Sequence, residues 1–218
     1  MRTVTDPRTP TPRLHASDRR LQLIETALDF FSRKGFSGTT TKEIAAAAGV
    51  TEAIIFRHFP TKQDLYNAVL DHRHEGGQLA ECIARWKSFM DRSDDEGLFR
   101  SMIENILEAH RSDLRVHRVL LFAALEGHET ALEYNRQFSF PIYELLCQYV
   151  TRRQGEGALL AGNPGAIIAA VYGMAEQYAT MTQMFGFHTN ATDQQMADSF
   201  VHIVMHGIQG NPDAQRAQ

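Results

Sequence analysis

Residues 40–59 read TTKEIAAAAGVTEAIIFRHF, and this stretch decides the fold that we expect for the chain. Thr40 and Glu43 form the S/T-x-x-E pattern of a capping box, which starts a helix that Gly49 ends. Thr51 can cap a second short helix. Small alanines in the first helix let the second pack closely, so the stretch predicts a helix-turn-helix. Capped helix N-termini direct backbone N–H groups outward, which suits the binding of phosphate.

Helical patterns continue on both sides of residues 40–59. Ser17 can cap a helix in which apolar residues recur with helical spacing as far as Phe31. Pro60 ends the second short helix, and helical patterns follow to Ile208 without a convincing strand-like alternation. We therefore predict an all-α fold of about nine or ten helices. A three-helix helix-turn-helix domain comes first, and a larger helical domain follows it.

The two ends of the chain are expected to differ from its folded part. Residues 1–16 contain three prolines and three arginines, and prolines at this density prevent a regular helix. We expect a disordered arm there. The simpler interpretation is a solvated tail, and the alternative is an arm that touches phosphates. The predicted domains are residues 17–62 for the helix-turn-helix and 63–210 for the second domain, with a disordered tail at 211–218.

The composition is that of an ordinary globular protein. Of the 218 residues, 43% are apolar and 22% are charged. The longest apolar runs are far shorter than a membrane span, and the N-terminus lacks the apolar core of a signal peptide. Cys82 and Cys147 make neither a disulfide framework nor a cysteine-rich zinc site. We therefore expect a cytoplasmic protein that does not insert into membranes.

The charge distribution is weakly asymmetric. The whole chain carries a formal net charge of −4, but residues 1–75 hold 11 Lys and Arg against 9 Asp and Glu. The remaining residues hold 11 against 17. Positive charge is thus concentrated in the first third, although this signal alone does not establish binding to nucleic acid.

Longer motifs make the helix-turn-helix specific. Residues 31–36 read FSRKGF, residues 40–51 read TTKEIAAAAGVT, and residues 56–65 read FRHFPTKQDL. Together they closely resemble the DNA-binding domain of the TetR family of transcriptional regulators, and the resemblance covers residues 17–70. It implies an N-terminal reader of double-stranded DNA and a C-terminal domain that binds a small-molecule effector and forms a homodimer.

The resemblance also implies DNA contacts at particular positions. Thr41, Lys42 and Lys62 are expected to meet backbone phosphate. The start of the recognition helix is expected to face base edges, and its end to reach phosphate or a base: Thr51, Glu52, Ala53 and Ile54, then Arg57 and His58.

Some of these positions have alternative interpretations. Phe56 stands where the family usually has Tyr, whose hydroxyl touches a phosphate, so that contact is missing or replaced. Glu52 can accept a hydrogen bond from cytosine, or it can be a solvated side chain. His58 can be an ordinary surface residue. Lys62 opposes the dipole at the start of its helix, which fits a phosphate contact better than a structural role.

The last two long helices, residues 166–187 and 194–208, are implied to pair with their copies in a four-helix bundle. The interface residues that we predict are Ile167, Ala170, Val171, Phe200, Ile203 and Val204. The alternative is that these side chains form the core within one chain.

The second domain is rich in aromatic and methionine side chains, which line adaptable ligand pockets but more often form cores. A small apolar or aromatic effector is therefore expected there. The predicted ligand-binding residues are Trp86, Phe89, Phe122, Phe138, Tyr143, Met174, Gln177 and Tyr178.

Enzymes and metal proteins are the main competing classes. His202 and His206 have the spacing of two metal ligands on one helix. The residues between them are Ile-Val-Met, however, and lack the Glu that acts as the base in the zinc-protease motif. A surface or interface pair is the simpler interpretation. We find no nucleophile elbow, phosphate loop or dinucleotide fingerprint, and we predict no catalytic residue, metal or cofactor.

The sequence thus predicts a ligand-responsive transcriptional regulator, and a repressor by the leaning of the family. It would bind a palindromic operator as a homodimer. The alternatives are a helical small-molecule or metal-binding protein whose DNA reader is disabled, and a helical interaction module that does not bind DNA.

Overall fold

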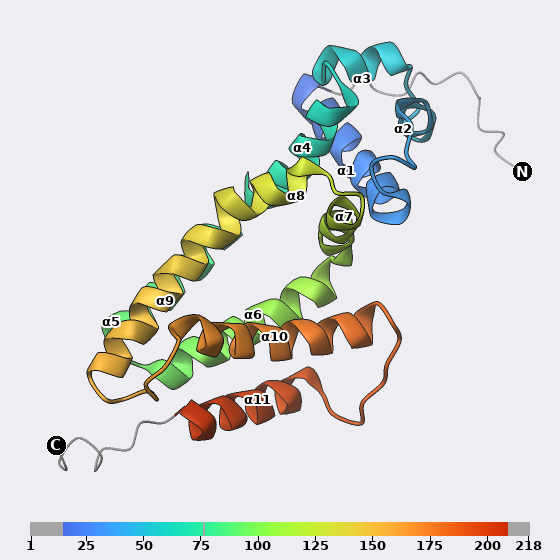
Figure 1. The fold of residues 1–218 in the computed structure, drawn as a ribbon. Coiled ribbons are helices and arrows are strands. Elements are labelled where there is room, and N and C mark those ends of the chain that lie inside the picture. Colours follow the sequence, from blue (N-terminus) through green and yellow to red (C-terminus); the bar gives the residue numbers. More distant parts are fainter. Residues whose placement is uncertain (1–14, 76, 209–218) are drawn as a thin grey trace, which may run out of the picture.

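The computed structural model describes residues 15–75 and 77–208, and the regular elements of these residues are helices (Figure 1). The prediction of an all-α fold is confirmed. The N-terminal part consists of α1 (Ala16–Lys34), α2 (Thr41–Ala47), α3 (Glu52–His58) and α4 (Lys62–Glu75). The rest consists of α5 (Gln78–Asp91), α6 (Asp95–Ser112), α7 (Leu114–Leu125), α8 (Glu129–Tyr134), the π-helical η1 (Asn135–Ser139), α9 (Phe140–Gly155), α10 (Pro164–Gln183) and α11 (Asp193–Ile208).

Elements α8, η1 and α9 follow one another as a single long rod (Figure 1). Counted this way, the described residues form ten helical rods, in agreement with the predicted number. None of the helices in this part of the chain is both long and apolar enough to span a membrane. The expected arm and tail lie largely outside the described residues, which begin at His15 and end at Ile208.

The helix-turn-helix forms as its caps predict. The Thr40 side chain accepts a hydrogen bond from the Glu43 N–H, and the Glu43 carboxylate accepts one from the Thr40 N–H. Gly49 follows with a φ of 67°, in the left-handed region that favours glycine. Thr51 occupies the N-cap of α3, although its side chain makes no capping hydrogen bond.

The predicted cap at Ser17 is wrong. Helix α1 begins one residue earlier, at Ala16, and His15 takes the cap position without a side-chain hydrogen bond. The Arg19 N–H donates to the His15 carbonyl, so the first helical turn already includes Ser17. The Ser17 side chain is therefore an exposed first-turn residue rather than a cap.

The first hydrophobic core joins α1, α4 and α7 in addition to the two helices of the helix-turn-helix. The fully buried Tyr66 ring packs edge-on against Phe31, with 4.8 Å between ring centroids, and its hydroxyl donates to the Val119 carbonyl at 3.2 Å. The expected domain boundary at residues 62 and 63 falls at the start of α4, but α4 packs in this first core.

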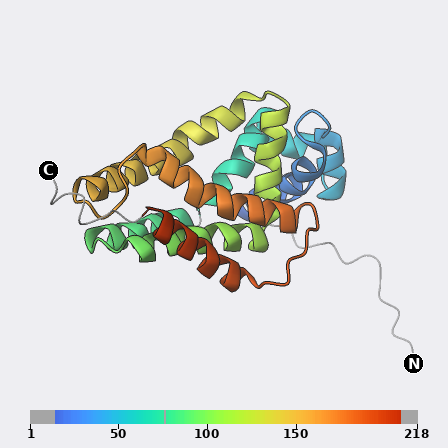
Figure 2. The ribbon, with the colours of Figure 1, turned by 60° about the horizontal axis from the view of Figure 1, so that its bottom comes forward.

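The second core is built from α5, α6, α9, α10 and α11. Helices α10 and α11 lie side by side and pack against α6 (Figures 1 and 2). Figure 1 shows this layer at the opposite end of the molecule from α2 and α3. The fold thus separates the helix-turn-helix from the last two long helices, with α7 and the α8–α9 rod between them.

A buried ionic network closes the far end of the second core. The Asp95 carboxylate at the start of α6 is 8% exposed, and it accepts hydrogen bonds from the Tyr149 hydroxyl at 2.5 Å and from the Arg153 guanidinium at 2.9 Å. Both partners lie on α9. Because these groups are hydrogen-bond partners of one another, removal of one leaves polar groups in the protein interior without that partner.

We expect Asp95→Ala to lower the free energy of unfolding by about 3 kcal/mol, because it removes the shared acceptor of the buried Tyr149 hydroxyl and the Arg153 guanidinium. Arg153 then keeps Glu156 as its remaining ion-pair partner. For a chain of this size the thermal midpoint should fall by roughly 6–12 °C. Differential scanning calorimetry measures both quantities. Asp91→Ala, at an exposed position near the end of α5, is the control and should change stability by less than about 0.5 kcal/mol. Equal stability of the two variants would contradict the assigned role of the network.

Candidate DNA-binding surface and effector region

The start of α3 presents a mixed apolar and cationic surface. Thr51, Ala53 and Arg57 are exposed, as is Lys42 on the neighbouring α2. Ile54 is half-buried, whereas the next residue, Ile55, is fully buried in the core. The Phe56 ring is 45% exposed, which is unusual for so large an apolar side chain and fits a surface that another molecule covers.

Thr41 and Glu52 satisfy one another instead of facing outward. The Thr41 hydroxyl donates to the Glu52 carboxylate at 2.5 Å, and both side chains are half-buried. This bond ties the start of α2 to the start of α3. Neither of the two interpretations of Glu52 from the sequence, a contact to cytosine or a solvated carboxylate, included this partner.

His58 turns one edge of its ring into the protein. Its Nε2 atom is buried and has no hydrogen-bond partner among the described residues. Burial lowers the pKa of His58, and the nearby cations Arg57, Arg20 and Arg19 lower it further. The ring is therefore neutral near pH 7, and it lies beside Phe59, which is fully packed in the core.

Lys62 at the start of α4 also has partners within the domain. Its ammonium group donates to the Phe36 carbonyl and lies 4.2 Å from the centroid of the Phe36 ring. Burial lowers the pKa of Lys62, against the attraction of Glu126 and Glu43. The side chain thus fastens α4 to the loop after α1, which is a structural role that the motif alone did not indicate.

The end of α7 is attached to the same loop. The Glu126 carboxylate accepts hydrogen bonds from the backbone N–H groups of Phe36 and Ser37, at 3.2 and 3.3 Å. Gly35 has a φ of 70°, and a Cβ atom there would collide with Oε1 of Glu126. Glycine is therefore required both for the backbone and for the close approach of α7.

Two arginines fasten α7 along α1. The Arg115 guanidinium donates to Asp29 at 2.7 Å and to Glu25 at 3.1 Å, and Arg118 donates to the Ser32 carbonyl at 2.8 Å. These bonds join residues about 90 positions apart, so no local sequence pattern could have indicated them. Together with Tyr66 and Glu126, they make α7 the main connection between the helix-turn-helix and the second core.

A family model described as "Bacterial regulatory proteins, tetR family" matches residues 23–69, from α1 into α4. Residues 23–69 are therefore a regulatory domain of the tetR family. The matched part carries the capped helix-turn-helix described above.

Individual relatives support this assignment. The transcriptional regulator TtgR of Pseudomonas putida is 34% identical over 104 residues, which is 48% of this chain and 48% of TtgR. The chain therefore matches only about half the length of this tetR-family relative.

Solved structures extend the similarity of fold to most of the chain. NalD of Pseudomonas aeruginosa, described as the secondary repressor of the MexAB-OprM multidrug efflux pump, has a TM-score of 0.63 and 24% identity. The similarity covers 89% of this chain and 98% of NalD. AibR, solved in complex with isovaleryl coenzyme A and operator DNA, has a TM-score of 0.63 and 21% identity over 85% of this chain and 97% of AibR.

The predicted ligand-binding residues do not gather around one cavity. The buried Trp86 donates to the Ser101 hydroxyl at 3.2 Å, and Phe89 and Met174 pack against the same second core. Phe122 lies beside Gly35, close to the helix-turn-helix. These side chains pack in the two cores, and their contact with an effector stays a prediction.

The other four predicted ligand residues are also dispersed. Tyr143 is 45% exposed on α9, and Gln177 is exposed on α10. The Tyr178 ring packs edge-on against Phe200. Phe138 alone lines an open cavity of about 860 Å³ between α4 and the α7–α8 connection. That cavity is polar along α4, where the Gln63 amide donates to Asn67 and Thr130.

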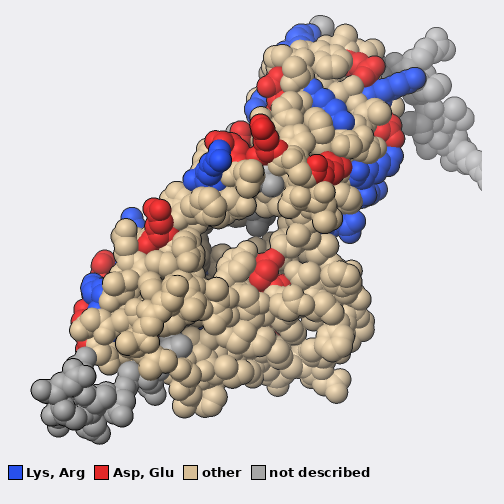
Figure 3. Space-filling model, viewed as in Figure 1, with Lys and Arg blue, Asp and Glu red and all other residues tan. Residues whose placement is uncertain are grey.

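The predicted interface residues divide into two groups. Val171 and Val204 are 0% and 4% exposed and belong to the core of one chain, so their assignment to the interface is corrected. Ile167 and Phe200 are half-buried against the same core. Ala170 is exposed, and Ile203 is 57% exposed. On the face seen in Figure 3, the surface over α10 and α11 carries almost no charged side chains.

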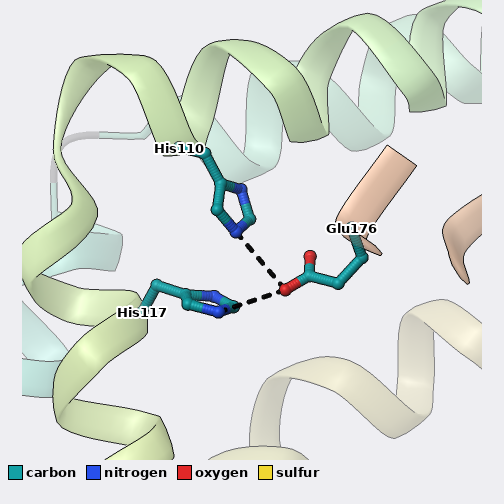
Figure 4. Close-up of side chains that lie close together, drawn as sticks. All are labelled: His110, His117 and Glu176. Carbon is teal, nitrogen blue, oxygen red and sulfur yellow. Dashed lines mark ion pairs between the residues drawn. The ribbon is translucent and has the colours of Figure 1, made fainter. Parts of the chain in front are cut away.

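A cluster of titratable groups was missed in the sequence. His110, His117 and Glu176 come from α6, α7 and α10, and their side chains converge in Figure 4. The two histidines are seven positions apart across a helix break, and the glutamate follows much later. No sequence spacing therefore indicated the cluster.

We expect Phe56→Tyr to tighten DNA binding. The exposed Phe56 ring occupies a position where the TetR family usually has Tyr, and a Tyr hydroxyl there can donate a hydrogen bond to a phosphate. A net gain of about 1 kcal/mol would strengthen binding about fivefold. Fluorescence anisotropy with a labelled duplex measures the dissociation constant of each variant. Phe56→Leu is the control and should leave the affinity nearly unchanged. Weaker binding of the Tyr variant would show that the ring has an apolar contact instead.

Proposed function

We propose that this protein is a ligand-responsive transcriptional repressor, which binds a palindromic operator as a homodimer and leaves it when an effector binds the second domain. The observation that carries the proposal is the capped helix-turn-helix, whose α3 begins with the exposed Thr51 and Ala53 and ends with the exposed Arg57. Such a helix fits the major groove with its first residues at the base edges. The description of NalD as a repressor supports the direction of regulation.

The DNA contacts that we propose are fewer than the sequence alone implied. Thr51, Ala53 and Ile54 face base edges, and Ile54 offers an apolar contact to a thymine methyl group. Lys42 and Arg57 are exposed cations that bind backbone phosphate. The other four predicted contacts have a structural role instead, because their polar groups are engaged or buried within the domain: Thr41, Glu52, His58 and Lys62.

Specific binding by this short helix requires a second copy. A dimer reads two half-sites about 34–36 Å apart, one turn of DNA. The outer face of α10 and α11 suits such pairing, since Ala170 and Ile203 are exposed there and charged groups are nearly absent (Figure 3). Small residues on α10, including Ala169 and Gly173, allow two helices to approach closely.

Helix α7 is the element through which an effector would act. It contacts α1 through Arg115 and Arg118, and it contacts the loop before α2 through Glu126. A ligand that binds more tightly to one position of α7 would shift the helix-turn-helix and change the spacing of the two readers. The complex of AibR with isovaleryl coenzyme A and operator DNA supports a function of this kind.

Selection from a pool of randomised duplexes tests the proposal. We expect the bound fraction to converge on a two-fold symmetric sequence. Arg57→Ala should weaken binding to all sequences alike and should reduce the dependence on salt by about one phosphate contact. Glu133→Ala, at an exposed position on α8, is the control and should leave both unchanged. No enrichment at low salt would favour the alternative of a ligand-binding protein with a disabled reader.

We expect Ile203→Arg to convert the protein into a monomer, because it places a charge at the centre of the apolar face. Analytical ultracentrifugation measures the oligomeric state, and operator affinity should fall by roughly 100-fold or more, since each half-site then binds alone. Leu132→Arg is the matched control: Leu132 is 58% exposed, against 57% for Ile203, but it lies on α8. Dimers of Ile203→Arg would contradict the proposed interface.

A further inference from the structure

Three side chains from different helices converge on one point at the inner face of α7. His110 lies in the last turn of α6, His117 in the first turn of α7, and Glu176 in the middle of α10 (Figure 4). The Nε2 atom of His110 is 3.3 Å from Oε1 of Glu176, and the Nε2 atom of His117 is 3.2 Å from the same oxygen. The centroids of the two imidazole rings are 4.3 Å apart.

His110 is held in the form that binds metals. Its Nδ1 atom is 2.9 Å from the Ile106 carbonyl, which can only accept, so Nδ1 carries the hydrogen. In the neutral ring Nε2 then has a lone pair, and this atom points toward Glu176. The side chain is 6% exposed, and Nε2 makes no hydrogen bond of acceptable geometry to the described residues. A buried lone pair without a donor is costly unless something else binds it.

The other two groups present lone pairs to the same point. Burial lowers the pKa of His117, so its ring is neutral near pH 7. Burial also opposes ionisation of Glu176, yet the two imidazoles beside it hold the pKa of its carboxyl below the ordinary value. Tyr172, one helical turn earlier on α10, also contributes to holding the pKa of Glu176 low. Burial opposes protonation of His110, but Glu176 and the Ile106 carbonyl raise its pKa overall. A metal ion at the cluster would therefore take the place of a proton on Nε2 of His110. Two imidazoles and one carboxylate face each other at this point.

We propose that His110, His117 and Glu176 form a binding site for a divalent transition-metal ion, with Zn²⁺ as the best fit. Zinc bonds of about 2.0–2.1 Å to nitrogen and oxygen in a tetrahedron place the donor atoms about 3.3 Å apart. The two nitrogen-to-oxygen separations in the cluster have this length, and all three donor atoms lie within 4.8 Å of one another. Imidazole donors exclude Mg²⁺ and Ca²⁺, which prefer oxygen ligands.

The three protein ligands leave a fourth position for water or for an added ligand, as in zinc sites that exchange a ligand. The nitrogen Nδ1 of His110, bonded to the Ile106 carbonyl, supplies the outer hydrogen bond that usually fixes a metal-binding histidine. The site thus has three ligands that converge on one point, and the hydrogen bond at Nδ1 of His110 fixes one tautomer.

A consequence for regulation rests on the proposed function. An ion at this site would join α7 to α6 and α10 on one side, while Arg115 and Arg118 join α7 to α1 on the other. The ion, alone or with a molecule in its fourth position, would then be the effector that sets the position of α7.

Direct titration of the full-length protein with Zn²⁺ tests the site. After treatment with a chelator, the protein is titrated in competition with a chromophoric chelator, and Co²⁺ replaces Zn²⁺ to report tetrahedral geometry by its visible absorption. We expect one tight equivalent per chain. His117→Gln and Glu176→Gln should lower the affinity by roughly 100-fold or more and abolish the tetrahedral spectrum. Thermal midpoints measured without metal verify that both variants fold.

The matched control is the exposed pair on α11. His202 and His206 have ring centroids 3.8 Å apart and are a second pair that can hold an added ion. The double variant His202→Gln/His206→Gln should keep the tight equivalent. Zinc affinity unchanged in His117→Gln and Glu176→Gln, or lost only in the double variant, would overturn the proposed site.

Operator binding is measured separately, so the two proposals fail independently. Loss of zinc binding in the cluster variants supports the site whether or not the protein binds DNA. If zinc binds at the cluster but operator affinity is the same with and without it, the site stands and its role as effector is overturned. If the wild-type chain binds no zinc but selects an operator, the metal site is overturned and the proposed regulator stands.

Discussion

The packing of α7 against α1 is the contact on which the arrangement of the two halves depends. Arg115 of α7 donates charged hydrogen bonds to Asp29 and Glu25 of α1, and beside this contact the buried Tyr66 of α4 donates to the Val119 carbonyl of α7. Apolar packing resists separation of the helices, whereas charged bonds fix their relative position along the axis. A helix held in this way moves as a rigid body. The helix-turn-helix must therefore follow any displacement of α7, and the groups on the opposite face of α7 determine where it rests.

Local patterns predicted the helix-turn-helix well because its structure is decided by neighbours in sequence. The box of Thr40 and Glu43, the turn at Gly49 and the end of α3 at Pro60 all involve residues within a few positions. The side chains expected to meet DNA were predicted less well. Glu52 and Lys62 have partners 11 and 26 residues away, and a motif that gives residue types cannot say which polar group is already satisfied inside the domain. Here hydrogen bonds between residues far apart in the sequence determine which of these side chains face outward and which face the interior of the domain.

The second domain could be predicted only as helical. Aromatic side chains can fill a core or line a pocket, and periodicity does not separate these uses. Trp86 was predicted to bind a ligand and is buried in the second core, and its contact with an effector stays a prediction. Val171 was predicted to lie at the dimer interface but is fully buried within one chain. The histidines show the reverse case, in which side chains converge without any pattern in the sequence. The spacing of His202 and His206 drew attention, although both are exposed, while His110 and His117 meet Glu176 only because α6, α7 and α10 cross. Convergence of this kind depends on how helices pack, which a single sequence does not state.

Gly35 has a further consequence for how the protein can change over generations. Its backbone has a positive φ, and the carboxylate of Glu126 occupies the space where a side chain would begin. One requirement arises from the turn after α1, and the other from a helix about 90 residues away. A substitution at this position would have to be tolerated by both at once. The reader of DNA and the domain behind it are thus constrained to evolve together at this point, even where the rest of their sequences diverge freely.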